Sequence, residues 1–228
     1  MLMEKAFVVI PAYNESPEVL RRVVAPLCRS GYRVVVVDDG SRDPAASALA
    51  GLPAVALRHR INRGQGAALQ TGMEYCRRHG ATCCIHYDAD GQHDPAEIPA
   101  LVAAIRNGAD IALGSRFLRP EDVAAVPPMR RGLLRLARCV NGALTGMWLT
   151  DAHNGFRALG RRALECIDIT EDRMAHASQI LSQIRRHRLR CVEVPTHIVY
   201  SDYSVGKGQG AVNAVNILID LLLDRFMG

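Results

Sequence analysis

The sequence predicts a single α/β domain with a mostly parallel central sheet flanked by helices. Short β-branched runs alternate with longer segments of helical period, a pattern typical of βαβ units around a buried sheet. The 228 residues suit one domain with a large core. No linker-like composition divides the chain, so we expect residues 1–228 to form that one domain.

The expected strands are short runs rich in Val, Ile, Ala and Cys. They cover residues 6–10, 33–37, 54–57, 83–87, 110–113 and 191–194. Apolar residues recur at helical spacing in 17–29, 64–79 and 95–106. Further helices are expected at 130–147, from Met174 onward and at 211–227, and the proline-containing segment 117–130 is expected to be a loop.

Polar side chains follow three of the expected strands at the point where each strand ends. The first strand runs into Pro11-Ala12-Tyr13-Asn14-Glu15, the second into Asp38-Asp39-Gly40-Ser41, and the fourth into Asp88-Ala89-Asp90-Gly91-Gln92. In open α/β sheets, ligands bind outside the carboxyl ends of the strands. We therefore expect one site along this edge of the sheet.

Asp88 and Asp90 are the candidate metal ligands of that site. Closely spaced carboxylates on a turn can hold Mg²⁺ or Mn²⁺ against phosphate oxygens. A DxD tripeptide alone is a weak signal, because aspartates are common in turns. The polar clusters at the ends of the other two strands favour a metal site over an ordinary turn at this pair.

The charge distribution favours phosphate-bearing partners. The formal net charge is +5, and the excess lies in arginine-rich stretches at 58–63, 116–138 and 185–190. Aromatic residues are few and no nucleic-acid-binding module is recognisable, so we expect an anionic lipid or a nucleotide and no nucleic acid.

Cysteine usage and hydropathy predict a cytoplasmic chain. Seven cysteines are scattered without a CxxC pair, which indicates a reducing compartment. The apolar run at 6–10 is too short for a signal peptide, and no run reaches about 18 uninterrupted apolar residues, so no membrane span is expected.

Four motifs occur in a fixed order: PAYNE at 11–15, VVDDGS at 36–41, NRGQGAAL at 62–69 and DADGQHD at 88–94. In these motifs the sequence resembles family 2 glycosyltransferases of the GT-A (Rossmann-like) fold, over essentially the whole chain. Four more segments resemble the polyprenyl-phosphate sugar transferases, such as dolichyl-phosphate mannose synthase and its bacterial relatives: GSRF at 114–117, HNGFRAL at 153–159, EVP at 193–195 and YSVGKGQ at 203–209.

The resemblance implies that residues 1–115 are the nucleotide-binding half. The residues expected at the nucleotide sugar are Pro11, Ala12, Tyr13, Glu15, Asp38, Asp39, Gly64, Asp88 and Ala89. The metal ligands would be Asp88, Asp90 and Gln92. Around Gly64, glycines let the backbone approach phosphate, and the helix that follows offers its positive N-terminus.

Residues 116–228 would then be the acceptor and membrane-facing half. Arginine forks suit phosphate oxygens, and the expected acceptor-binding residues are Arg116, Arg131, Arg135, Asn154, Arg157 and Gln209. Asp90, Arg116 and Lys207 are the expected catalytic residues, with Lys207 stabilising the charge of the leaving group. Gln179 is an amide and cannot act as a base.

The expected reaction is inverting transfer of a hexose from a GDP- or UDP-linked donor to a polyprenyl phosphate, with Mg²⁺ or Mn²⁺. The enzyme would be peripheral at the inner face of the cell membrane, with the membrane surface, a small membrane protein and a second copy of the chain as further partners. The sequence does not choose the donor base, the sugar or the oligomeric state.

Two alternatives stay open. One is transfer to a saccharide or another small acceptor in cell-envelope polysaccharide synthesis, which requires a base that the sequence does not identify. The other is a non-catalytic GT-A-like module that binds a nucleotide or a partner. A dinucleotide-dependent oxidoreductase is disfavoured, because no GxGxxG follows the first strand.

Overall fold

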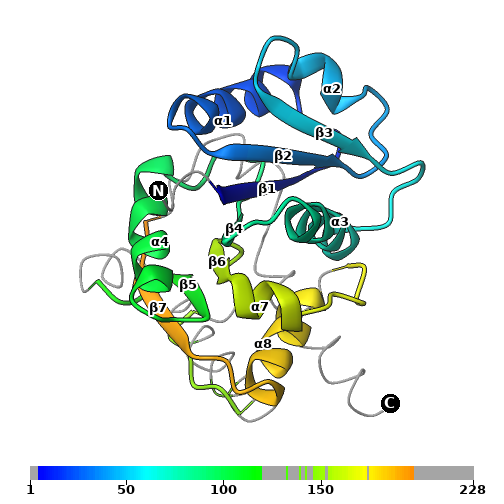
Figure 1. The fold of residues 1–228 in the computed structure, drawn as a ribbon. Coiled ribbons are helices and arrows are strands. Elements are labelled where there is room, and N and C mark those ends of the chain that lie inside the picture. Colours follow the sequence, from blue (N-terminus) through cyan, green and yellow to red (C-terminus); the bar gives the residue numbers. More distant parts are fainter. Residues whose placement is uncertain are drawn as a thin grey trace.

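A seven-stranded sheet in the order β3-β2-β1-β4-β6-β5-β7 runs through the molecule (Figure 1). The computed structural model describes residues 5–119, 132, 139, 142, 146–151, 154–173 and 175–197. The strands are β1 (Ala6–Ala12), β2 (Arg33–Asp38), β3 (Ala54–Arg58), β4 (Cys83–His86), β5 (Ile111–Ser115), β6 (Arg157–Gly160) and β7 (Cys191–Pro195). Only β6 runs antiparallel to its neighbours, β4 and β5, so the prediction of a mostly parallel sheet is confirmed.

Helices cover both faces of the sheet. Because strand side chains alternate between faces, Val8 and Ile10 of β1 pack with one set of helices and Phe7 and Val9 with the other. The first set is α1 (Pro17–Arg29), α2 (Ala45–Ala48) and α4 (Ile98–Arg106). The second set is α3 (Gln65–Arg78), α7 (Arg161–Cys166) and α8 (His176–Arg186). Both faces of the sheet are therefore buried, as the continuous valine run of β2 requires.

Within the described residues, the predicted strands and the helices at 17–29, 64–79, 95–106 and from Met174 onward are confirmed apart from small shifts at their ends. The segment 95–106 divides into a 3₁₀ turn, η2 (Pro95–Glu97), followed by α4, and the helix expected from Met174 onward begins at His176. The strand β6 and the short helices α2 and α7 were not predicted. The helix predicted at 211–227 and most of the one at 130–147 lie outside the described residues.

All seven cysteines are free thiols. Within the described part of the chain, no helix combines the length and apolar character needed to cross a membrane.

Candidate active site

A pocket of about 420 Å³ lies where β1, β2 and β4 end. It brings together most of the residues predicted from the sequence: Pro11, Ala12, Tyr13, Glu15, Asp39, Gly64, Asp88, Ala89, Asp90, Gln92, Arg116, Asn154 and Arg157. Asn62, Gln65, Ala68, His93, Gly155, His176 and Ala177 complete its lining. Residues from both halves of the sequence therefore line the same pocket.

Five predicted site residues do not line this pocket within the described structure. Arg131, Arg135, Lys207 and Gln209 lie outside the described residues. Asp38 is described but is not part of the lining.

Asp88 is held by two side-chain donors. Gln65 Nε2 donates to its Oδ1 at 3.0 Å, and His93 Nε2 lies 3.1 Å from its Oδ2. Burial acts to raise the pKa of Asp88, but the hydrogen bond from His93 and the charges of His93 and Arg157 outweigh it, and the pKa is lowered. Asp88 is therefore an oriented, ionised carboxylate.

Asp90 has the opposite electrostatic environment. Burial and the negative charge of Asp88 raise its pKa, and Glu15 adds to the effect. The backbone N–H of Gln92 donates to Asp90 Oδ1 at 3.0 Å and partly opposes this. Asp88 and Asp90 are thus two carboxylates that repel each other on one turn, an arrangement that a cation relieves.

His93 orients Asp88 from within the core. Its ring stacks on Phe156, with ring centroids 4.7 Å apart, and meets Tyr87 edge-on. The Tyr87 hydroxyl donates to the carbonyl of His93. Because a carboxylate only accepts, the Nε2 that faces Asp88 carries the proton in the neutral ring. The buried Nδ1 has no hydrogen-bond partner among the described residues.

Asp39 ties the end of β2 to the loop before α3. Its Oδ1 lies 2.7 Å from His59 Nδ1 and accepts the Arg63 N–H at 3.0 Å, while its Oδ2 accepts the Gly64 N–H at 2.6 Å. His59 is held in turn by Thr71, with Nε2 and Oγ1 2.8 Å apart. The one carboxylate therefore fixes a segment about 25 residues away in the sequence.

Asp38 stabilises the turn that follows β2. Its two oxygens accept the backbone N–H groups of Ser41 at 2.8 Å and Ala45 at 3.0 Å, and Arg58 lies 3.6 Å away. The carboxylate is buried and closes the turn that follows β2. Its predicted contact with base or ribose stays a prediction that this geometry does not favour.

The backbone N–H groups at the start of α3 were expected to face a phosphate, but they bind oxygens of the protein. The Gly64 N–H is bound by Asp39, and the N–H groups of Gly66 and Ala67 both donate to the Asp172 carbonyl, at 2.8 and 3.3 Å. These three donors are engaged inside the protein and do not point to a phosphate. The glycines serve close packing instead: a Cβ on Gly64 or Gly66 would collide with the backbone at 171–172.

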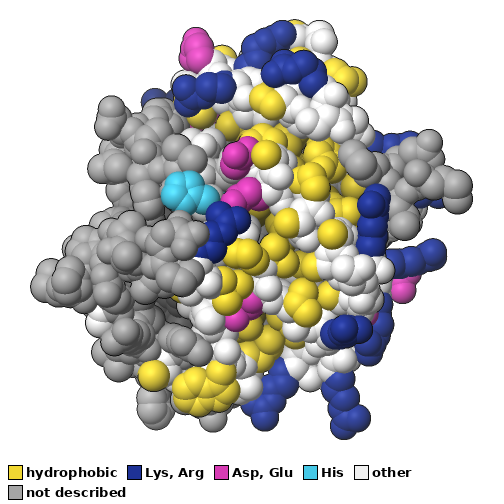
Figure 2. Space-filling model, turned by 90° about the vertical axis from the view of Figure 1, so that its left-hand side faces the viewer, with side chains coloured by type: hydrophobic (Ala, Val, Ile, Leu, Met, Phe, Trp, Pro, Cys, Tyr) yellow, Lys and Arg dark blue, Asp and Glu magenta, His cyan; other side chains and the backbone are white. Residues whose placement is uncertain are grey.

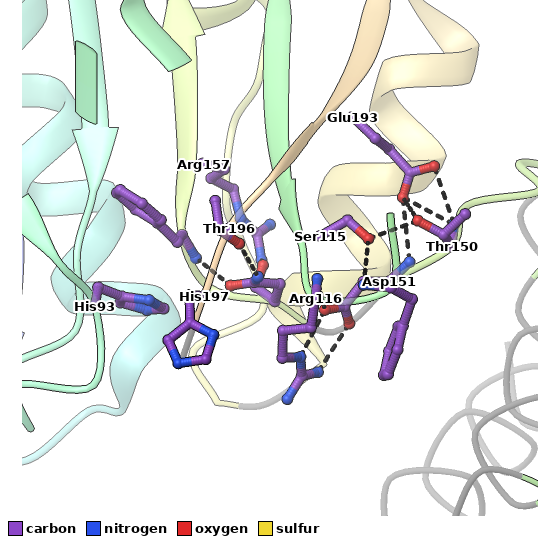
Figure 3. A network of polar contacts seen from close by, with 12 residues as sticks. His93, Ser115, Arg116, Thr150, Asp151, Arg157, Glu193, Thr196 and His197 are labelled. Atoms are coloured by element: carbon purple, nitrogen blue, oxygen red, sulfur yellow. Dashed lines mark hydrogen bonds and ion pairs between the residues drawn. The ribbon is translucent and has the colours of Figure 1, made fainter. Parts of the chain in front are cut away.

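Arg116 lines the pocket but is paired with a buried acid. Its Nε donates to Asp151 Oδ2 at 2.6 Å and its Nη2 to Asp151 Oδ1 at 2.8 Å. The backbone N–H of Arg116 also donates to Asp151, at 3.2 Å. Figure 3 shows this two-pronged pair at the end of β5.

Arg157 is the buried cation of the pocket. It is 3 % exposed, its Nη2 donates to the Asn154 carbonyl at 3.0 Å, and its Nε has no partner in the described structure. Burial lowers its pKa to about 10, against the effect of Asp88, so it stays charged at neutral pH. None of the described carboxylates forms an ion pair with it.

Two histidines lie near Arg157. Burial and the charge of Arg157 lower the pKa of His176 to about 4 and bring the pKa of His86 well below its ordinary value. His176 Nδ1 lies 2.6 Å from the Arg173 carbonyl, which can only accept, so Nδ1 carries the proton of the neutral ring. Both rings are therefore neutral at physiological pH.

Gly155 and Asn154 complete the wall beside Asp88. A Cβ on Gly155 would lie 2.9 Å from Asp88 Oδ2, so only glycine fits against this carboxylate without displacement. Asn154 Nδ2 donates to Thr196 Oγ1 at 3.2 Å, and its Oδ1 accepts the Phe156 N–H at 3.0 Å. The turn before β6 is thus fixed on both sides.

Several functional contacts were not predicted from the sequence. Two of them are the hydrogen bond from Gln65 to Asp88 and the close packing of Gly155 against Asp88; both residues lie within the matching motifs NRGQGAAL and HNGFRAL, which was the available signal. Asp151, the partner of Arg116, precedes the second motif by two residues and carried no signal of its own.

Among the described residues, no group of three or more His, Cys, Asp or Glu forms a ready-made metal site.

The surface near these elements is chemically mixed. Figure 2 shows acidic, basic and histidine side chains next to one another on one face, with a largely apolar and neutral surface beside them. Such a face can meet a ligand that combines charged and apolar parts.

Comparison with known proteins agrees with this geometry. The model of glycosyl transferase family 2 matches residues 7–168. Polyprenol monophosphomannose synthase of Mycolicibacterium smegmatis is 33% identical over 91% of this chain and 82% of its own length. The UDP-N-acetylglucosamine–dolichyl-phosphate N-acetylglucosaminyltransferase of Methanococcus voltae is 28% identical over 95% of this chain and 94% of its own length.

A solved structure shares the fold. Glucosyl-3-phosphoglycerate synthase from Mycobacterium tuberculosis, in complex with Mn²⁺ and UDP-glucose, superposes with a TM-score of 0.67 at 18% identity, covering 97% of this chain and 79% of that one. The predicted GT-A fold is confirmed. With a family model that spans most of the sheet and its motifs, the chain belongs to the family 2 glycosyltransferases and is an enzyme of that family.

Proposed function

We propose that this glycosyltransferase moves a hexose from a nucleotide diphosphate sugar to a polyprenyl phosphate, with inversion at the anomeric carbon. The observation that carries the proposal is the pairing, in one pocket, of the Asp88 and Asp90 carboxylates with the buried guanidinium of Arg157. The carboxylates suit a cation that accompanies a diphosphate, and a buried arginine without an ion-pair partner suits an anionic oxygen of a substrate.

The relatives support the acceptor class. Two relatives align over more than nine-tenths of this chain: the name of one specifies transfer to dolichyl phosphate, and the name of the other specifies polyprenol monophosphomannose as the product. Their donors differ, one being UDP-linked N-acetylglucosamine and the other supplying mannose, so they leave the donor of this chain open between UDP and GDP sugars.

Asp88 and Asp90 fit a divalent cation, Mg²⁺ or Mn²⁺. Their mutual repulsion, seen in the raised pKa of Asp90, is the condition that a bound cation removes. Mg²⁺ is commonly held by one or two carboxylates together with substrate phosphates and water, and Gln92 is the further candidate ligand. When bound, the cation would neutralise charge on the diphosphate that leaves.

Asp39 is the proposed donor-binding carboxylate of the end of β2. Two donors already occupy its Oδ1 and one occupies Oδ2. A carboxylate oxygen has about two acceptor sites, so Oδ2 can accept one more hydrogen bond, from a ribose hydroxyl or a base N–H. Tyr13 and Glu15, on the loop after β1, line the same side of the pocket.

Arg157 and Arg116 would position the anionic acceptor. An ionised phosphate oxygen forms the new bond to the anomeric carbon while the bond to the diphosphate breaks. Because the attacking oxygen carries no proton, the step needs no protein base, which agrees with the low pKa of His176 and with an amide at Gln179. Lys207 stays the candidate for stabilising the leaving group, with Arg131, Arg135 and Gln209 as further acceptor contacts.

A lipid acceptor would place the enzyme at a membrane surface. We propose a peripheral association at the cytoplasmic face, supported by the arginine-rich stretches. Association with a small membrane protein or with a second copy of the chain belongs to the same proposal.

The test is a transfer assay with UDP- and GDP-linked sugars, each offered polyprenyl phosphate or a soluble saccharide. Transfer to the lipid phosphate is expected, together with loss of activity in EDTA and recovery with Mg²⁺ or Mn²⁺. Asp90→Asn should lower kcat/KM about 100-fold, whereas Asp94→Asn, which alters an exposed cap on the same loop, should change it little. Transfer to the saccharide alone, or an active Asp90→Asn enzyme, contradicts the proposal.

A further inference from the structure

Glu193 lies on β7, at the edge of the sheet, and does not line the pocket. Its carboxylate accepts four hydrogen bonds from one turn. The Thr150 N–H donates to both oxygens, at 2.8 and 3.0 Å, the Thr150 hydroxyl donates to Oε1 at 2.6 Å, and the Asp151 N–H donates to Oε1 at 3.1 Å (Figure 3). One acid therefore fixes the backbone of two consecutive residues.

The same turn holds Arg116 at three atoms. Asp151 binds its Nε, its Nη2 and its backbone N–H. The neighbour Ser115 is attached as well, since its hydroxyl lies 2.6 Å from Thr150 Oγ1. Both the main chain and the side chain at this end of β5 are thereby fixed to the turn that Glu193 anchors.

The cluster orients Arg116 but has no net positive charge. Arg116 contributes one positive charge, and Asp151 and Glu193 contribute two negative ones. Asp151 is 5 % exposed, so its pairing with the guanidinium is shielded from water. An unpaired arginine keeps about 2 kcal/mol of rotamer entropy, and a two-pronged carboxylate pair fixes the plane of the guanidinium before any substrate arrives.

We propose that Glu193 is a positioning residue for Arg116, acting through Thr150 and Asp151. Glu193 touches no pocket atom, and its effect on catalysis passes through the orientation of one guanidinium. The inference rests on the proposed function in one respect, that Arg116 contacts the anionic acceptor.

A double-mutant cycle tests this role. Glu193→Gln keeps the size of the side chain but replaces one acceptor oxygen by a donor that faces N–H groups. In the wild-type background it should raise the KM for polyprenyl phosphate about tenfold, with the KM for the nucleotide sugar unchanged. In an Arg116→Ala background the same change should have an effect below about twofold.

Glu97→Gln is the matched control. Glu97 also accepts a backbone N–H next to β7, that of His197 at 2.9 and 3.0 Å, but it has no contact with the turn at 150–151. The Glu97→Gln variant should keep the KM for the acceptor within about twofold of the wild-type value. Equal effects of Glu193→Gln in both backgrounds, or an equal effect of Glu97→Gln, overturn the positioning role.

A second measurement separates this proposal from the proposed function. In a ¹⁵N spectrum of the arginine Nε–H groups, the Arg116 signal is identified by its loss in Arg116→Ala. Glu193→Gln and Thr150→Val should both shift that signal, and Glu97→Gln should not. If the wild-type enzyme transfers nothing to polyprenyl phosphate, the proposed function fails, and the spectra alone decide whether Glu193 positions Arg116; an unmoved signal in both folded variants refutes it.

Discussion

The two walls of the pocket, named after their proposed ligands, are built differently: the donor wall contains Asp39, Asp88 and Asp90, and the acceptor wall contains Arg116, Asn154 and Arg157. On the donor wall, contacts stay within one turn, as between Asp90 and Gln92, or reach 20 to 25 residues ahead, as from Asp39 to the segment 59–64. On the acceptor side, the linking contacts span 35 to 43 residues, as in Arg116 with Asp151 and Thr150 with Glu193. The turns after β2 and β4 together with the segment leading into α3 specify the donor wall, whereas the packing of β5, β6 and β7 specifies the acceptor wall.

The charges differ in the same way. The donor wall concentrates negative charge that is only partly compensated, at Asp88 and Asp90. The acceptor wall contains one arginine paired with an acid, Arg116, and one buried arginine, Arg157, that pairs with no acid in the part of the chain that the structure describes. The pocket is thus polarised across its width, so that a cation and an anion can be accommodated side by side.

The largest effect is expected from the two arginines of the acceptor wall. Arg157→Met should lower transfer activity about 100-fold, while the free energy of unfolding stays equal or rises by about 1 kcal/mol, because a buried charge without a carboxylate partner is removed. Arg116→Met should instead destabilise the fold by about 3 kcal/mol, since it leaves Asp151 buried and unpaired. Urea unfolding measures the stability of both variants, and transfer assays measure their activity. If Arg157→Met is destabilised as much as Arg116→Met, the proposed difference between the two arginines is wrong.

Behind the donor wall, Asp38→Asn should act mainly on stability. The amide keeps one acceptor but places a donor against the Ser41 or Ala45 N–H, so we expect a loss of about 2 kcal/mol in the free energy of unfolding. The KM for the nucleotide sugar should change less than about threefold. Asp43→Asn, at an exposed position of the same loop, should change neither quantity. A large rise in the KM of a still stable Asp38→Asn protein would instead assign this residue to the base or ribose.

The buried histidines make stability depend on pH. In the folded state the pKa of His176 is about 4, and it is 6.5 in an unfolded chain, so the unfolded state binds more protons below pH 6.5. The neutral His176 ring therefore contributes its whole share of the free energy of unfolding above pH 6.5, and this share decreases as the pH falls toward 4. For this residue alone, the free energy of unfolding should fall by about 2 kcal/mol between pH 7 and pH 5.

Unfolding curves at several pH values measure this loss. His176→Gln should flatten the dependence in that interval, and His86 should account for part of what remains, because its pKa is lowered in the same direction. His79→Asn, at an exposed position, is the control and should leave the slope unchanged. An unaltered slope in His176→Gln would show that this ring takes up protons equally in the folded and the unfolded state, and would contradict its lowered pKa.

A smaller effect is expected where the two walls meet. Gly155→Ala places a Cβ 2.9 Å from Asp88 Oδ2, so the carboxylate has to move, and transfer activity should fall about tenfold. Gly31→Ala is the control: Gly31 has φ +82° and no atom near its added Cβ, so alanine there should cost about 1 kcal/mol of stability and leave activity intact. If both variants lose activity equally, general destabilisation explains the loss.

The carboxylates of the donor wall were predictable because each directly follows a strand that is recognisable in the sequence. Hydrophobic runs such as VVVV end in acidic turns, and strand alternation with helical spacing then places Asp39, Asp88 and Asp90 at one edge of the sheet. The same reasoning did not separate Asp38 from Asp39, because which of two adjacent carboxylates turns inward depends on the backbone of the turn.

The acceptor wall was predictable only in part. Arg116, Asn154 and Arg157 were indicated by motif resemblance, but the four residues of β6 are too few to show a strand period. Asp151 gave no pattern, and Glu193 belonged to the EVP motif without an indicated role, because the contacts of both depend on strands that are distant in the sequence and adjacent only in the folded sheet. The N–H groups at the start of α3 were misassigned because the competing acceptor, the Asp172 carbonyl, lies about 100 residues further along the chain.

The antiparallel strand β6 has a consequence for how such enzymes diversify. The chain leaves β5 at Ser115 and re-enters the sheet beside it at Arg157, with the Gly114 N–H bound to the Phe156 carbonyl at 2.8 Å. Since both ends of the intervening segment are anchored at one edge, its length is not constrained by a crossover. The segment between β5 and β6 can therefore vary in length without any change in the strands β1, β2 and β4 that end at the pocket.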